Sequence, residues 1–170
     1  ANTTASNNVA IGISALATNT TGTSNTAVGF GTLFANTTAD YNTGVGNYAL
    51  YNNTTGSKNT ATGYLALCAN TTGAGNTAHG YLALCTNTTG HCNTTVGDSS
   101  LRANTTGCFN TASGYRALFS NTTANKNTAF GAESLYTNTT GSDNVALGRR
   151  SLYANTITNT SITGACCVSV

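Results

Sequence analysis

Residues 53–69 read NTTGSKNTATGYLALCA, and residues 70–86 read NTTGAGNTAHGYLALCT. The two stretches place Asn, Thr, Gly and Leu alike, and the pattern returns every 17 residues along the chain. A fixed period of this kind is typical of a solenoid, in which each unit buries its apolar face against its neighbours. Ten units begin at Asn2, Asn19, Asn36, Asn53, Asn70, Asn87, Asn104, Asn121, Asn138 and Asn155.

The repeat fills the chain, so we expect residues 1–170 to form a single repeat domain. Positions are counted 1 to 17 from the first Asn of each unit. Positions 7, 11 and 15 carry Asn, Gly and Leu in each of the first nine units, and the tenth unit loses all three. The degenerate last unit is therefore expected to cap the array or to serve as an assembly tail.

The composition within a unit favours strands over helices. Thr, Asn and Gly are poor helix formers, and known helical repeats are longer than this unit. Positions 7 to 11 alternate, as in Asn25-Thr-Ala-Val-Gly29, which predicts a short strand ending in a glycine turn. A second short strand is predicted from the Ala-Leu pair through the next Asn-Thr-Thr. The predicted fold is thus all-β: a parallel β-solenoid, or β-roll, of ten coils with two strands per coil.

Charge and hydropathy exclude several functions. Charged residues make up 6% of the chain and the net charge is +2, whereas about 25% charged residues is usual for globular proteins. This is too little positive charge for a nucleic-acid interface, and no apolar run has the length of a membrane span. Because the chain begins at Ala1 without Met or a signal-like segment, it is expected to be a mature chain or a segment of a longer one.

Three stretches, NNVAIG (7–12), SNTAVG (24–29) and DNVALG (143–148), resemble the head repeat of YadA-type trimeric autotransporter adhesins. The longer pattern NTAxGYxALxxNTTG resembles repeats of surface adhesins and of phage or viral fibre proteins. The resemblance implies a left-handed parallel β-roll that trimerises at the cell surface. The unit of 17 residues here departs from the unit of about 14 in that family.

Residues that could carry out catalysis do not cluster in the repeat. Asp40, Asp98, Glu133 and Asp143 fall in four different units at four different positions, so no carboxylate pair is expected. His79 replaces an apolar residue at position 10, where it is interpreted as a core-facing or tolerated substitution. No Ser-His-Asp arrangement is visible. The chain is therefore not expected to be an enzyme, or to bind a metal or cofactor.

Cysteines recur at equivalent positions of neighbouring units. Cys68 and Cys85 both occupy position 16, so in a solenoid they lie about 4.8 Å apart, within the range of a disulfide. Cys92 and Cys108 form the next candidate pair. Paired cysteines favour an oxidising, extracellular setting. Free buried thiols are the alternative, because connectivity cannot be deduced from sequence.

Two further roles for cysteine remain open. His91 with Cys92 and Cys108 is a weak metal-site candidate that lacks the usual C-x-x-C spacing. The tail contains the vicinal Cys166-Cys167, which could cross-link chains, and then Val168 and Val170, which alternate like a docking strand. These four tail residues are the assembly candidates.

The recurring Asn-Thr-Thr has two interpretations that are compatible unit by unit. It satisfies the N-glycosylation pattern, which predicts covalent glycans along one edge of the rod. Alternatively, stacked Asn amides bond one another along a solenoid and Thr packs well on a pleated surface. The glycosylation candidates are Asn2, Asn19, Asn36, Asn53, Asn70, Asn87, Asn104, Asn121 and Asn138, with Asn52, Asn93 and Asn159 in addition.

The leading hypothesis is an extracellular structural or adhesive fibre subunit, glycosylated on the Asn-Thr-Thr ladders. It self-associates, with a trimer as one possibility, and presents its surface to a host or matrix. An alternative is ice binding through bare Thr and Asn rows, which resemble the ice-binding faces of some β-solenoid antifreeze proteins. A third hypothesis is the shaft of a phage or viral fibre, which differs from the first hypothesis mainly in the kind of organism or virus that makes the protein.

Overall fold

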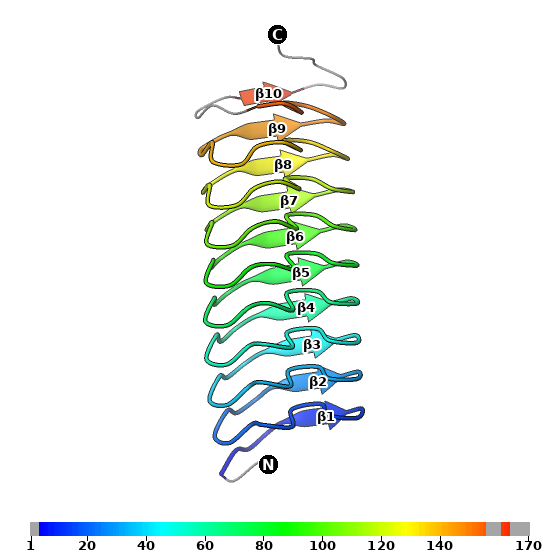
Figure 1. Ribbon diagram of the computed structural model, residues 1–170, viewed down its shortest axis with the longest axis vertical. Helices are drawn as coiled ribbons and strands as arrows, with labels where there is room; N and C mark the ends of the chain where they lie inside the picture. The colour runs from blue at the N-terminus through cyan, green and yellow to red at the C-terminus, as the bar shows by residue number, and fades with distance from the viewer. Residues whose placement is uncertain (1–3, 156–160, 164–170) are drawn as a thin grey trace.

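The computed structural model describes residues 4–155 and the backbone of residues 161–163. The chain winds into a parallel β-solenoid with one 17-residue repeat per turn, and residues 4–155 make between eight and nine turns (Figure 1). The predicted all-β parallel β-solenoid is confirmed, whereas ten coils were predicted and these residues make eight to nine turns. The strands are β1 (Val9–Ile11), β2 (Thr26–Val28), β3 (Thr43–Val45), β4 (Thr60–Thr62), β5 (Thr77–His79), β6 (Thr94–Val96), β7 (Thr111–Ser113), β8 (Thr128–Phe130), β9 (Val145–Leu147) and β10 (Ser161–Thr163).

The strands form one parallel sheet along the whole rod, in the order β1 to β10 (Figure 1). Strands β1 to β9 pair in strict 17-residue register, as in Thr60↔Thr77 and Ala61↔Ala78. Strand β10 instead pairs with β9 at a separation of 16 residues, with Ser161 opposite Val145. The middle residue of β2 to β9 is buried, whereas the two flanking residues are exposed or half-exposed. Strand alternation therefore places position 9 inside the coil and positions 8 and 10 on the outer face of the sheet.

The apolar core is a column of small and medium side chains behind the sheet. Leu at position 15 is fully buried in the central coils, and Ala at positions 9 and 14 packs beside it. Each Leu has neighbours above and below only because the coils stack, which explains why no unit could form this core alone. The buried leucines are Leu16, Leu33, Leu50, Leu67, Leu84, Leu101, Leu118, Leu135 and Leu152.

A ladder of buried asparagines at position 1 runs along the interior. Asn70 Nδ2 donates to Asn53 Oδ1 on the preceding coil at 2.7 Å and to Gly73 O within its own coil at 2.9 Å. The same two contacts recur from Asn36 to Asn138. Bonding within the ladder satisfies groups that are expensive to bury unpaired.

Position 7 supplies a second asparagine ladder with different partners. Asn76 Oδ1 accepts the backbone N–H of Asn93 at 3.0 Å, and Asn76 Nδ2 donates to Gly90 O at 2.9 Å. The carbonyl of Gly90 also accepts from Asn87 at 2.9 Å. The carbonyl at position 4 thus accepts one hydrogen bond from each asparagine ladder. This shared acceptor explains why the two Asn positions recur at fixed spacing in the sequence.

The expected second strand of each coil is absent from residues 4–155, where each coil contains one strand. The segment after the strand is a series of turns, because Leu67 has φ +54° and the N–H of Asn70 donates back to Leu67 O at 3.3 Å. A left-handed residue and a three-residue turn are incompatible with extended backbone. Residues at positions 6 and 13 also have positive backbone φ, as at Lys58 (+62°) and Leu65 (+55°).

Candidate functional site

The outer face of the sheet carries a row of threonines at position 8. Strands β2 to β8 each begin with Thr, and successive threonines are register partners. These side chains are exposed or half-exposed. The neighbouring outward row, at position 10, is mixed: it contains Val45 and Val96 but also Thr62, His79 and Phe130. We call the position-8 row the threonine row; its members are Thr26, Thr43, Thr60, Thr77, Thr94, Thr111 and Thr128.

Aromatic side chains at positions 12, 13 and 16 gather on the turns that follow the sheet. We call this surface the aromatic stripe; it consists of Phe30, Phe34, Tyr48, Tyr51, Tyr64, Tyr81, Tyr115, Phe119, Tyr136 and Tyr153. Rings at the same position stack at coil spacing, with centroids 5.6 Å apart for Tyr64–Tyr81 and 5.1 Å for Tyr136–Tyr153. Tyr48 joins positions 13 and 16 through an edge contact with Tyr51 at 5.3 Å.

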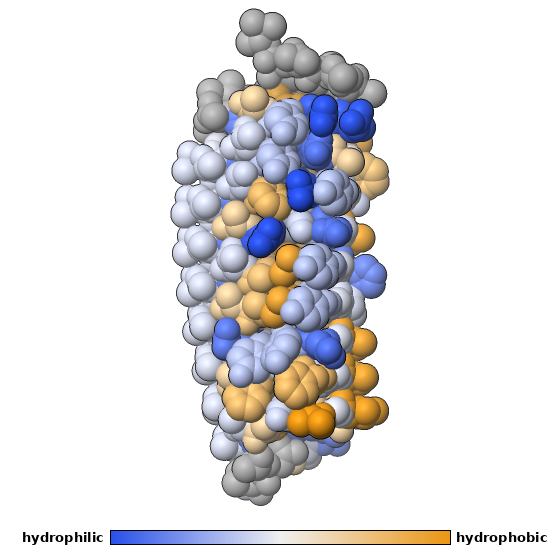
Figure 2. Space-filling model, turned by 45° about the vertical axis from the view of Figure 1, so that its right-hand side comes forward, coloured by the Kyte–Doolittle hydropathy of each residue, from blue (hydrophilic) through white to orange (hydrophobic). Residues whose placement is uncertain are grey.

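The four arginines of the chain lie on the same surface, toward its C-terminal end. Arg102 lies over the Phe119 ring at 5.8 Å, and Arg116 lies 5.0 Å from the centroid of Tyr115. Arg150 pairs with Glu133 at 2.6 Å. In Figure 2, the most apolar residues of this face gather toward the N-terminal end, and more of the strongly hydrophilic ones lie toward the C-terminal end.

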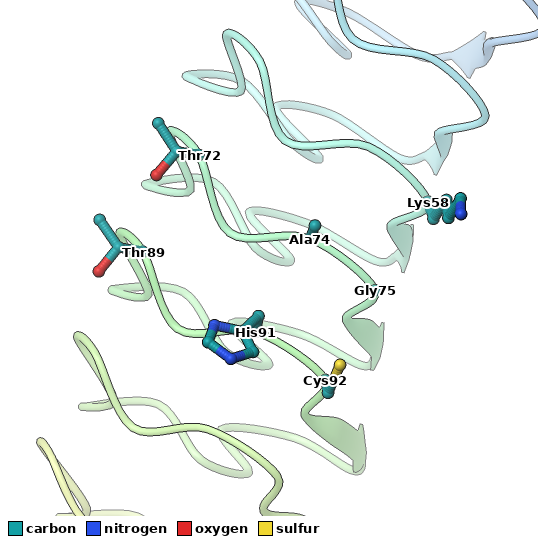
Figure 3. A pocket seen from close by; sticks show the side chains of 7 residues that line it. All are labelled: Lys58, Thr72, Ala74, Gly75, Thr89, His91 and Cys92. Carbon is teal, nitrogen blue, oxygen red and sulfur yellow. The ribbon is translucent and has the colours of Figure 1, made fainter.

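A shallow hollow of about 360 Å³ opens on another face, where Gly75 leaves a gap in the row of position-6 side chains. Figure 3 shows Lys58 and Cys92 on the coils before and after this gap, with His91 beside Cys92. Thr72 and Thr89 border the opposite side. The hollow is open, and the residues that line it include no carboxylate, so it holds no pair of carboxylates for acid/base catalysis.

Burial contradicts the expected glycans on the asparagine ladders. Of the candidates, Asn19, Asn36, Asn53, Asn70, Asn87, Asn93, Asn104, Asn121 and Asn138 are 0% exposed. Their amide nitrogens donate hydrogen bonds inside the coil, as Asn70 does, and a glycan on that nitrogen has no room there in the folded chain. Asn52 is exposed. Asn2 and Asn159 lie outside the residues whose side chains are described.

The cysteines at position 16 stack as expected but do not form the predicted disulfide. Cys68 and Cys85 are free thiols with their sulfurs 3.6 Å apart, well beyond a bond length of about 2.05 Å. The second expected disulfide, between Cys92 and Cys108, is not formed either. Cys108 Sγ instead contacts His91 Nδ1 at 3.2 Å, and Cys92 is an exposed free thiol.

The remaining sequence candidates are dispersed over the rod. Among the described residues, no three His, Cys, Asp or Glu side chains are grouped as metal ligands would be, so the trio of His91, Cys92 and Cys108 is not assembled. His79 is exposed and contacts the Thr62 hydroxyl, so it does not face the core. The reason is that position 10 points outward from the strand.

The four acidic residues stay apart, and three of them contact residues nearby. Asp98 Oδ1 accepts a hydrogen bond from the Ser99 hydroxyl at 2.6 Å. Asp40 accepts the Thr23 N–H at 2.6 Å and its hydroxyl at 3.0 Å, while Glu133 holds the ion pair with Arg150 described above. The assembly candidates Cys166, Cys167, Val168 and Val170 lie outside the described residues. Sequence reasoning missed the aromatic stripe, although the recurrence of Tyr and Phe one, two and five residues after the repeat glycine signals it.

Comparisons with models of protein families, with curated proteins and with solved structures found no match to this chain. Within the described part of the chain, no helix has the length and hydropathy to cross a bilayer.

Proposed function

We propose that this chain is a structural subunit of an extracellular fibre, and that copies associate side by side through the aromatic stripe. The observation that carries the proposal is the unbroken stack: every coil from residue 19 to residue 152 buries an asparagine at position 1 and a leucine at position 15. A one-dimensional array of this kind is suited to spanning a distance and presenting a periodic surface. In this proposal the chain catalyses no reaction and uses no cofactor.

The aromatic stripe is the surface best suited to self-association. Tyr64, Tyr81 and Tyr115 are each about half exposed, and aromatic side chains are enriched at protein interfaces. The stacked rings cover one another's faces, so they offer edges and hydroxyls to a partner. Low charge along most of the rod leaves little repulsion between copies. The extracellular location and the trimer rest on the resemblance to surface-adhesin repeats.

We expect the double substitution Tyr64→Ser and Tyr81→Ser to weaken self-association by at least about tenfold in Kd, because loss of two interface aromatics costs more than about 1.4 kcal/mol. Sedimentation equilibrium across a range of protein concentrations measures this. The matched control is Tyr41→Ser, which removes a ring that is 61% exposed but lies off the stripe. A chain that stays at 17.1 kDa at every concentration would contradict the proposal.

A second candidate function is ice binding through the threonine row. The observation that favours it is that the seven hydroxyl side chains stand in register on the outer face of one sheet, spaced at about 4.8 Å by the strand pairing. With the ladder asparagines buried, glycans on them do not cover this face.

If ice binding is the function, the purified chain shows thermal hysteresis, and Thr77→Lys at the centre of the row removes most of it by placing a long charged side chain on the flat face. Thr89→Lys is the control, since Thr89 is also exposed but lies outside the strands. Absence of hysteresis in the unsubstituted chain at millimolar concentration rejects this candidate and leaves the fibre proposal untouched.

A further inference from the structure

The position-16 row changes from rings to thiols in the middle of the rod. Cys68 and Cys85 sit on consecutive coils, both half-buried, with sulfurs 3.6 Å apart. The Cys68 thiol also lies 3.7 Å from Cys85 O. Backbone bonds hold the two coils together at this point, since the N–H of Ala69 donates to Cys85 O at 3.0 Å. The thiols therefore face each other in a fixed arrangement.

The next residue in the row, Arg102, distinguishes the two sulfurs. The pKa of Cys85 is lowered to about 7, first by the hydrogen bond from the Cys68 thiol and then, against the effect of burial, by the positive charge of Arg102. The same hydrogen bond and burial raise the pKa of Cys68 above its usual range. Cys68 and Arg102 are the titratable or charged groups that act on Cys85. Cys85 is accordingly the more readily ionised of the two thiols, and Cys68 is its hydrogen-bond donor.

We propose that Cys85 and Cys68 form a thiol-exchange site at which Cys85 is the nucleophile toward small-molecule disulfides and Cys68 is the resolving thiol. The inference rests on the facing thiols and on the placement of Arg102 beside one of them, and it does not depend on the fibre or ice-binding proposals.

The reaction takes place in two balanced steps. The Cys85 thiolate attacks one sulfur of oxidised glutathione; a Cys85–glutathione bond forms, the glutathione S–S bond breaks, and one glutathione leaves and takes up a proton. Cys68 then loses its proton to solvent and attacks the Cys85 sulfur, which expels the second glutathione. The chain loses two hydrogens, and one oxidised glutathione becomes two reduced ones. Closing the gap of 3.6 Å requires a shift of about 1.5 Å to reach bonding distance.

The test treats the reduced full chain with oxidised glutathione, quenches it with acid, and locates each modified cysteine by peptide mass spectrometry. We expect the unsubstituted chain to end with a Cys68–Cys85 bond, whereas Cys68→Ala stops at a stable glutathione adduct on Cys85. Alanine fits this row, because Ala17 occupies position 16 in the first coil. Cys92→Ala is the control, and it should leave the products at Cys68 and Cys85 unchanged.

The pH dependence supplies a readout that exposure alone would not produce. The rate at Cys85 should rise with a midpoint near pH 7 and move toward about 8.5 in Cys68→Ala. At pH 7 the rate should fall about threefold in that variant, since a smaller thiolate fraction is partly offset by greater nucleophilicity. Arg102→Gln should shift the midpoint in the same direction, and Arg116→Gln should not. Faster modification of the exposed Cys92 than of Cys85 at pH 7, or a persistent adduct on Cys85 in the unsubstituted chain, would overturn the proposal.

Discussion

Asn87→Asp is expected to destabilise the folded chain by about 3–5 kcal/mol at neutral pH, although the side chain keeps its shape. Asn87 Nδ2 donates to Asn70 Oδ1 and to Gly90 O, each at 2.9 Å. A carboxylate there loses both donations, sets its oxygen against two acceptors, and places an uncompensated charge in the interior. Urea denaturation followed by circular dichroism at pH 7.5 measures the loss.

Acidification should restore part of that stability. Burial beside acceptors raises the pKa of the introduced carboxyl in the folded chain above its unfolded value of about 3.9. The folded state therefore binds the proton more tightly, and stability relative to the unsubstituted chain rises as the pH falls from 7.5 toward 4. The control is Asn52→Asp, because Asn52 is exposed. Equal effects of the two substitutions at pH 7.5 would show that Asn87 has no role in a buried ladder.

Gly80→Ala is expected to cost about 3–5 kcal/mol and to divide the rod into two segments. Gly80 has φ +139°, and a Cβ there would lie 2.5 Å from Gly97 O on the next coil. The substitution thus combines a backbone region that L-residues rarely adopt with a clash against a carbonyl in the stack. Because each coil is stabilised by its neighbours, we expect a lower and broader urea transition as the two segments unfold separately.

Gly75→Asn is the matched control for the glycine prediction. Gly75 has φ +69°, and the nearest atom to an added Cβ is Cys92 Sγ at 3.5 Å, an ordinary contact. Asn7 occupies the same position 6 with φ +58°, and Asn tolerates this region. The control should change the urea midpoint little. A comparable loss at both glycines would mean that general loss of glycine, and not the close approach of coils at position 11, causes the effect.

Much of the solenoid follows from local pattern. The alternation at positions 7 to 11 predicted a strand that the structure places at positions 8 to 10, for example Thr60–Thr62. The predicted second strand is wrong, because Leu67 and its equivalents adopt left-handed backbone. Leucine rarely does so, and no propensity scale anticipates it. The burial of Leu in a continuous column, available only once the coils stack, offsets a cost of about 1–2 kcal/mol per residue.

The sequence predicted which residues of the candidate sites are neighbours, but it did not predict how their side chains interact. Equal repeat positions indicated that Cys68 and Cys85 would be neighbours, and they are, yet the 3.6 Å between their sulfurs leaves them as free thiols. The aromatic stripe combines positions 12, 13 and 16, and its continuity depends on how the turn folds back, as the Tyr48–Tyr51 contact at 5.3 Å shows.

By itself, the sequence determined the period of 17, the coil boundaries and which residues stack on which, because identical units can satisfy one another only in register. Only the tertiary structure decided on which side of the coil each side chain lies. Asn-Thr-Thr is compatible with a glycosylated edge and with an internal ladder. The asparagines form the internal ladder because the carbonyl at position 4 accepts hydrogen bonds from asparagines of two coils. Gly90 O, for example, accepts from Asn87 Nδ2 and from Asn76 Nδ2. Those hydrogen bonds need three segments distant in sequence to meet, and no local pattern contains that information.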